Sequence, residues 1–145
     1  MDVNIHRIDQ TLPLPKYQTS GSVAFDIYAR CDIDILPQNL GKIPSNLIIQ
    51  VPKGYVLFIK DRSSTASKGL LFTAGIIDQD YYGADDEILL QVFNFTTKVV
   101  HISRGERIAQ GIFLAIEQAE WKESSNFFAD KNRNGFGSTG DMEKL

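Results

Sequence analysis

Hydrophobic residues along this chain occur in short segments with the spacing of β-strands, and a helical period is rare. Ile33 and Ile35 alternate with two aspartates. Residues 54–60, 87–95 and 107–114 are rich in β-branched or aromatic side chains and are bounded by turn-forming residues. Only residues 63–68 favour a short helix. The five prolines lie in the first 52 residues, at positions that suit strand edges and turns.

This pattern predicts an all-β fold, either an antiparallel sandwich or a distorted jelly-roll-like barrel. The 145 residues are enough for one hydrophobic core but not for two. Apolar side chains become scarce after about residue 122. We therefore predict a β-barrel domain over residues 1–121 and a flexible C-terminal arm over residues 122–145.

Composition and charge argue against several classes of function. The net charge of −3 and the pI near 5.3 disfavour nucleic-acid binding, which needs a basic face. No apolar run approaches the roughly 18 residues that cross a membrane. The N terminus lacks the apolar core of a signal peptide, so we expect an intracellular, cytoplasmic protein that binds no membrane. A single cysteine, Cys31, excludes an internal disulfide and a multi-cysteine zinc site.

The segment 75–83, with the sequence GIIDQDYYG, carries the most suggestive chemistry. Gly75 and Gly83 bracket two short runs that could fold as a tight hairpin, with Asp78 near its tip and Tyr81 beside it. The spacing of its aspartates also suggests a calcium loop, but the twelfth position, where a glutamate is needed, is a leucine. An acidic surface turn is the alternative, and the segment alone does not decide between the two.

The segment 135–140, GFGSTG, matches the pattern GxGxxG. Only five residues follow it, too few for the helix and the acidic residue of a dinucleotide-binding fold. Its amides and hydroxyls suit phosphate oxygens, and Phe136 between two glycines can lie flat on a base. A disordered tail is the alternative interpretation.

Five separated segments together resemble the five motifs of the trimeric dUTP pyrophosphatase (dUTPase) family, in the family's order and near its spacing. They are residues 21–29, 61–69, 75–83, 105–110 and 135–140, with the sequences GSVAFDIYA, DRSSTASKG, GIIDQDYYG, GERIAQ and GFGSTG. The resemblance implies the β-clip form of the barrel and a homotrimer whose active sites each draw on three chains. It also implies Mg²⁺-dependent hydrolysis of dUTP to dUMP and pyrophosphate, which limits uracil in DNA and supplies dUMP for thymidylate synthesis.

The resemblance further implies roles for single residues. Asp78 is expected to be the catalytic general base, and the ring of Tyr81 is expected to exclude a ribose 2′-hydroxyl. The main chain at Gly75 and Ile77 is expected to read the uracil edge. Magnesium is expected mainly on the substrate phosphates, with Asp26 and Gln110 holding its water shell. The other expected substrate ligands are Arg62, Ser63, Ser64, Gln110, Lys131, Arg133, Phe136, Gly137, Ser138 and Thr139.

Several of these residues have a structural alternative or depart from the family pattern. Asp26 could be a polar residue on the solvent side of its strand, and we interpret Arg107 as structural. Lys131 stands where the family usually has arginine, so Lys131 or Arg133 could fill that role. Phe72 stands where many members have a base-contacting asparagine. Extra residues that include Asp85, Asp86 and Glu87 are expected to form a solvent-exposed acidic bulge.

Two other functions compete with dUTP hydrolysis. The related dCTP deaminases share the fold, but their catalytic glutamate would fall at Gln91, and glutamine cannot transfer the protons that deamination needs. A bifunctional deaminase and dUTPase is the alternative that release of ammonia from dCTP would favour. A non-catalytic nucleotide-binding module is disfavoured because Asp78, Tyr81 and Phe136 are all present. We therefore expect a dUTPase.

Overall fold

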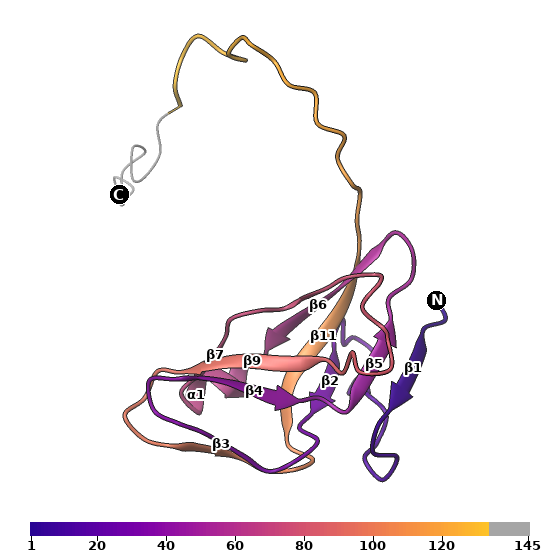
Figure 1. Cartoon of the computed structure of the whole chain (residues 1–145), viewed down its shortest axis with the longest axis vertical. Coiled ribbons are helices and arrows are strands. Elements are labelled where there is room, and N and C mark those ends of the chain that lie inside the picture. Colours follow the sequence, from indigo (N-terminus) through magenta and orange to yellow (C-terminus); the bar gives the residue numbers. More distant parts are fainter. Residues whose placement is uncertain (134–145) are drawn as a thin grey trace.

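Small antiparallel sheets surround a single hydrophobic core (Figure 1). The structure, a computed structural model, describes residues 1–133. Its elements are β1 Asn4–Arg7, β2 Phe25–Tyr28, β3 Ile33–Ile35, β4 Leu40–Pro44, β5 Leu47–Gln50, β6 Tyr55–Asp61, α1 Ser63–Ser67, β7 Leu70–Phe72, β8 Ile76–Ile77, β9 Leu89–Asn94, β10 Val100–Ile102 and β11 Arg107–Ala115. The largest sheet has the order β2-β11-β6-β8 and the next has the order β4-β9-β7. The pairs β1-β5 and β10-β3 complete the fold.

The core receives aliphatic side chains from all of these sheets. Ile49 of β5, Leu57 of β6, Val92 of β9 and Ile102 of β10 are each at most 1% exposed. Burial of such a side chain contributes roughly 1.5–3 kcal/mol, so inward-facing residues of many short strands together hold the fold. The all-β prediction is confirmed. Residues 1–133 form four small sheets where a sandwich has two, and these sheets do not close into one ring, so the fold is a distorted barrel.

The functional region is built around the pairing of β6 with β11. It runs without interruption from Tyr55 opposite Ala115 to Asp61 opposite Ala109. The predicted short helix follows directly as α1. Its start is stabilised by the hydroxyl of Thr65, which accepts a hydrogen bond of 3.2 Å from the Arg62 amide and donates one of 2.9 Å to the Ile108 carbonyl.

The predicted hairpin within residues 75–83 is wrong. Ile76 and Ile77 of β8 pair with Phe58 and Leu57 of β6, and the residues after β8 form a loop. A side chain at position 75 would place its Cβ 2.1 Å from the Ile59 carbonyl oxygen, so only glycine allows this close approach. Gly75, which suggested a hairpin, therefore allows close packing against β6, a strand that lies well before it in the sequence.

The last strand ends at Ala115, and residues 116–133 extend away from the folded body without a helix or strand (Figure 1). All of them are exposed, including Trp121 at 92%, Phe127 at 99% and Phe128 at 93%. In the part of the chain that the structure describes, no helix has the length and apolar character needed to cross a bilayer.

Candidate active site

Three charged side chains meet where β6 ends, and we call them the guanidinium cluster: Asp26, Arg62 and Arg107. Asp26 Oδ1 lies 2.9 Å from Arg62 Nε, and Arg107 Nη1 donates a hydrogen bond of 3.2 Å to Asp26 Oδ2. Asp26 is only 6% exposed, so its assignment to the solvent side of the strand is wrong. One carboxylate against two guanidinium groups leaves a net positive charge, which suits an anionic ligand.

Gln110 and Ser64 border this cluster. Gln110 lies directly opposite Asp26 in the pairing of β2 with β11, and its amide donates to the Asp61 carbonyl at 3.0 Å. Arg62 Nη1 donates to the Ser64 hydroxyl at 3.4 Å, and the hydroxyl residue before it, Ser63, is also exposed. The structure thus brings together five expected ligands that are spread over 85 positions of the sequence, from Asp26 to Gln110.

A bulge in β11 explains how Arg107 joins the same group. The register of β11 against β2 shifts by one residue between Arg107 and Ala109. Residues three apart on a regular strand face opposite sides, whereas the extra residue lets Arg107 and Gln110 both face Asp26. Sequence reasoning treated Arg107 as structural, and only the bulge shows that its guanidinium lies among the expected ligands.

Asp78 and Tyr81 lie on the loop of residues 78–88, between β8 and β9, which we call the Asp78 loop, and Gly75 and Ile77 lie just before it. Asp78 is exposed at the edge of a hollow of about 460 Å³. The hollow is lined by Tyr55, Val56, Ile77, Asp78, Gln79, Asp80, Ile116 and Gln118. On the other side of β8 a second hollow, of about 450 Å³, is lined by Phe58, Ile59, Lys60, Phe72, Thr73, Ala74, Gly75 and Ile76.

Hydrogen bonds attach the Asp78 loop to the barrel at both ends. Gln79 Nε2 donates to the Tyr55 carbonyl at 3.0 Å. At the far end, Arg30 Nε and Nη2 each donate a bond of 2.8 Å to the Glu87 carboxylate. These bonds raise the pKa of Arg30. The Tyr81 hydroxyl donates to the Glu87 carbonyl at 3.3 Å, which connects the middle of the loop to its end.

The expected acidic bulge is only partly exposed. Asp85 is exposed, as predicted, and Asp86 is half-buried and accepts a hydrogen bond of 2.6 Å from the Gly83 amide. The prediction is wrong for Glu87, whose side chain is only 12% exposed because it faces Arg30. No sequence signal marks this pair, since the two residues lie 57 positions apart.

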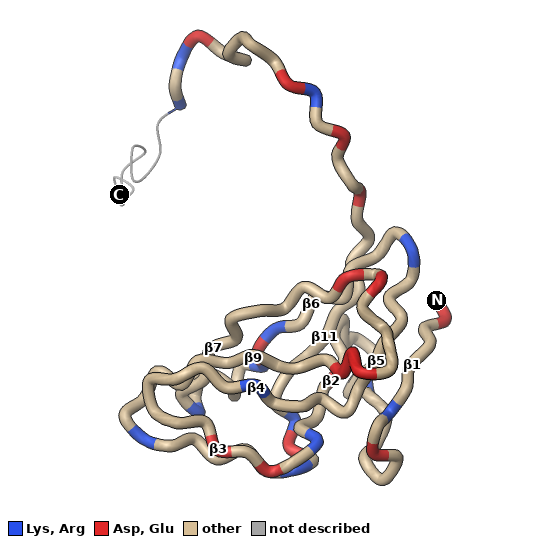
Figure 2. Tube along the Cα trace, viewed as in Figure 1, with Lys and Arg blue, Asp and Glu red and all other residues tan. Residues whose placement is uncertain are grey.

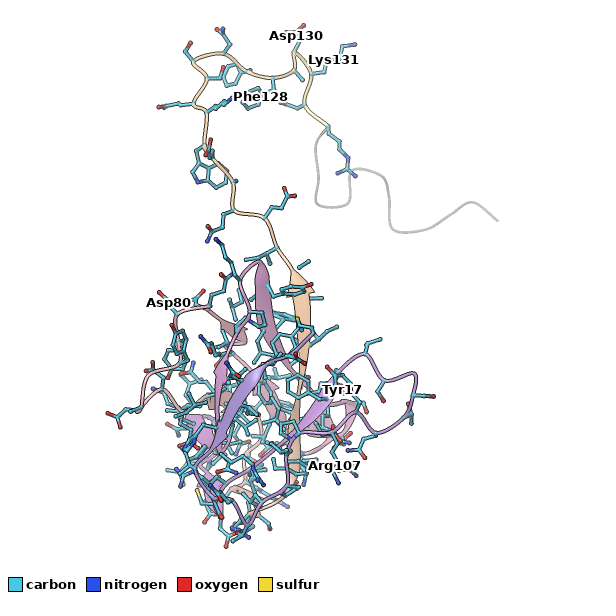
Figure 3. All side chains as sticks on the ribbon, turned by 90° about the vertical axis from the view of Figure 1, so that its right-hand side faces the viewer. Tyr17, Asp80, Arg107, Phe128, Asp130 and Lys131 are labelled. Atoms are coloured by element: carbon cyan, nitrogen blue, oxygen red, sulfur yellow. The ribbon has the colours of Figure 1, made fainter. Side chains whose placement is uncertain are left out.

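The guanidinium cluster and Asp78 lie at opposite ends of β6. Ile77 pairs with Leu57, and the chain runs from there to Asp78 in the direction away from Arg62. At about 3.3 Å per residue, roughly 20 Å of strand separates the two groups, more than an aspartate and an arginine side chain can span. In Figure 3, Asp80 and Arg107 lie toward opposite ends of the folded body.

Comparison with known proteins shows the family of this chain. Residues 10–140 match the family model described as dUTPase, which is most of the chain. The chain belongs to the dUTPase family. It is 38% identical to the deoxyuridine 5'-triphosphate nucleotidohydrolase of Dictyoglomus turgidum over 95% of this chain and 97% of that one. It is 34% identical to the enzyme of the same name from Fowlpox virus, over 96% and 97% of the two chains.

Solved dUTPase structures confirm the fold. The dUTPase of Staphylococcus bacteriophage 80alpha, solved with dUPNHPP, matches with a TM-score of 0.84 and 22% identity over 96% of this chain and 98% of that chain. A mutant form of the dUTPase of phage phi11 matches with a TM-score of 0.77 and 19% identity over 88% of this chain and 99% of that one. The β-clip architecture expected from the five motifs is therefore correct.

The remaining residues expected from the dUTPase motifs lie on the arm or beyond the described residues. Lys131 and Arg133 are exposed, and Figure 3 shows Lys131 far from the folded body. Phe136, Gly137, Ser138 and Thr139 lie outside the described residues. On the folded body, lysine and arginine are interspersed with aspartate and glutamate (Figure 2). Among residues 1–133, no group of three or more His, Cys, Asp or Glu side chains could hold a metal ion by itself.

Proposed function

We propose that this protein is a dUTP diphosphatase, which hydrolyses dUTP to dUMP and pyrophosphate. The observation that carries the proposal is Asp78, an exposed carboxylate at the edge of a hollow, within the residues 10–140 that match the dUTPase family model. A carboxylate in this position can accept the proton of a water molecule that attacks the α-phosphorus. The names of the relatives support the same substrate. Removal of dUTP limits uracil in DNA, and the product dUMP supplies thymidylate synthesis.

The guanidinium cluster is the proposed binding site of the phosphates. Arg62 donates charge-assisted hydrogen bonds to phosphate oxygens, and the exposed hydroxyls of Ser63 and Ser64 donate further bonds. When a triphosphate binds, Arg62 exchanges part of its contact with Asp26 for the ligand, while Arg107 still neutralises the carboxylate.

Mg²⁺ is the proposed cofactor, and the residues present fit it. Asp26 and Gln110 provide oxygen atoms side by side across two strands, which suits a hard cation. Both oxygens of Asp26 already face guanidinium groups, so these two residues fit the water shell of the ion better than its direct ligands. The ion itself would neutralise charge on the substrate phosphates. The phage phi11 dUTPase is described with a structural Mg(II) ion.

Base and sugar selection are assigned to β8 and the Asp78 loop. The backbone at Gly75 and Ile77 offers fixed donors and acceptors to the uracil edge. Cytosine presents the reverse pattern there, and each mismatched buried polar group costs about 1–3 kcal/mol. The Tyr81 ring, 37% exposed, would lie against the deoxyribose and leave no room for a 2′-hydroxyl. Phe136 of the arm would then stack on the uracil.

The separation along β6 supports active sites that are shared between chains, and we propose a homotrimer. A general base must lie within hydrogen-bonding reach of the attacking water, yet about 20 Å of strand separates Asp78 from Arg62. We propose that one chain supplies Asp78 and a second supplies the guanidinium cluster. The arm of a third chain, residues 122–145, would close over this site on the barrel, residues 1–121. Lys131 or Arg133 would contact the phosphates, with Gly137, Ser138 and Thr139 beside them.

The direct test measures pyrophosphate release from dUTP, dCTP, dTTP and UTP in parallel. We expect kcat/KM for dUTP to exceed the other three by at least about 100-fold, because several buried polar contacts would be mismatched. We also expect no ammonia from dCTP, since the Gln91 amide donates to the Thr73 hydroxyl at 2.9 Å and offers no carboxylate. Equal use of the four nucleotides, or release of ammonia, would contradict the proposal. An intracellular, cytoplasmic location fits the proposed substrate, because nucleoside triphosphates are made and used there.

Replacement of Tyr81 with alanine is expected to raise the efficiency with UTP relative to dUTP by about tenfold, because the ring would no longer occupy the space of the 2′-hydroxyl. The matched control is Tyr82→Ala, which removes the neighbouring tyrosine, 47% exposed. The measurement is the ratio of kcat/KM values for the two nucleotides. A ratio that changes equally in both variants would argue against sugar selection by Tyr81.

A further inference from the structure

We propose that Glu87 is a positioning residue, which holds the Asp78 loop in its working conformation through Arg30. The inference rests on the proposed function, because it concerns how Asp78 and Tyr81 are placed for dUTP hydrolysis. Glu87 itself touches neither the proposed substrate positions nor the guanidinium cluster. It lies at the end of the acidic segment of residues 85–87.

Hydrogen bonds from two residues hold the Glu87 carboxylate. The carboxylate accepts two hydrogen bonds of 2.8 Å from the Arg30 guanidinium in a bidentate arrangement. It accepts a third, also of 2.8 Å, from the main-chain amide of Asn46. The side chains are 31% exposed for Arg30 and 12% exposed for Glu87. Bidentate pairs of this kind fix orientation as well as distance. The end of the loop is therefore tied to the residues that follow β2 and β4.

Asn46, one of the residues that bind Glu87, is in turn hydrogen-bonded to Asp9. Asn46 has a φ of 72°, a conformation that asparagine tolerates better than most residues. Its side-chain oxygen accepts a bond of 2.6 Å from the Asp9 amide, and its side-chain nitrogen donates one of 2.9 Å to the Asp9 carbonyl. Asn46, which donates a hydrogen bond to the Glu87 carboxylate, is thus itself held in place.

Two further bonds carry this constraint to the functional side chains. The Tyr81 hydroxyl donates to the Glu87 carbonyl, and the Asp86 carboxylate accepts from the Gly83 amide. Tyr81, Tyr82 and Asp85 are exposed, so burial of apolar surface does little to fix the loop. In a segment held mainly by polar contacts, loss of one anchor changes conformation more than overall stability.

The test compares Glu87→Gln with Asp85→Asn. Both substitutions remove one negative charge from the same segment, but only Glu87 faces Arg30. We expect Glu87→Gln to lower kcat for dUTP by about tenfold, with KM changed less than about threefold, because a small displacement of a catalytic group is costly. We also expect the preference for dUTP over UTP to fall, and chymotrypsin to cut faster after Tyr81 and Tyr82. Asp85→Asn should stay within about twofold of the wild-type protein in all three measurements.

A purely structural role predicts a different result. Glu87→Gln would then lower the melting temperature while kcat, nucleotide preference and loop cleavage stay unchanged below it, and this outcome would overturn the proposal. If Glu87→Gln does not fold, Arg30→Lys keeps the charge but loses the bidentate geometry and should show the same pattern more weakly. Lack of dUTP hydrolysis by the wild-type protein would refute the proposed function instead. The faster cleavage after Tyr81 and Tyr82 does not depend on activity and tests the attachment separately.

Discussion

Replacement of Asp78 with asparagine is expected to lower kcat for dUTP by about 100- to 10,000-fold, the range that general base catalysis contributes. The amide keeps the shape of the carboxylate but cannot accept a proton from water. Affinity for the nucleotide should change by less than about threefold, because the proposed phosphate and base contacts do not involve this side chain. Pyrophosphate release gives kcat, and calorimetric titration with a non-hydrolysable dUTP analogue gives the affinity.

Asp85→Asn is the appropriate control for this experiment. It removes the same charge from the same loop, seven positions further along, at an exposed residue. The control should retain the wild-type rate within about twofold. Near-normal turnover by Asp78→Asn would show that Asp78 is not the general base. A large loss of nucleotide affinity would indicate that the carboxylate positions the substrate instead.

Mixing Asp78→Asn with Arg62→Gln is expected to restore activity that neither variant has alone. If Asp78 and Arg62 of one site come from different chains, random exchange in an equal mixture gives about one site in four with both residues intact. The recovered rate should therefore approach about a quarter of the wild-type rate. Arg62→Gln should still fold, because Arg107 continues to neutralise the buried Asp26.

The control mixture combines Asp78→Asn with a chain that carries both substitutions. No site in this mixture has an intact Asp78, so activity should not rise. Native mass spectrometry can verify that chains have exchanged in each case. Absence of recovery after verified exchange would show that a single chain supplies the whole site, against the geometry of β6.

The sequence was sufficient to predict those elements whose pattern is local. β6 and β11 were expected because each segment is rich in β-branched or aromatic residues and is bounded by turn-forming residues. The short helix after Arg62 was also expected from its local sequence. Arg62 and Arg107 lie at the ends of these elements. The ligand role of Arg62 came from the resemblance to the dUTPase family, and Arg107 was expected to be structural.

What the sequence could not show depends on pairing between distant segments. Gly75 suggested a local turn, yet it allows β8 to approach Ile59 of β6. The bulge that brings Arg107 to Asp26 is a mismatch between two strands, so neither strand shows it alone. Glu87 was expected in solvent because its partner Arg30 lies far away in the sequence.

The exposed segment of residues 116–133 also determines what optical spectroscopy can detect in this protein. Trp121 is the only tryptophan in the chain, and it lies in this segment at 92% exposure, directly before residue 122, where the arm begins. Its emission therefore reports the surroundings of the start of the arm and carries no signal from the barrel core. Unlabelled protein can thus reveal contacts of the arm with a ligand or another chain, whereas unfolding of the barrel must be followed by a different probe, such as circular dichroism.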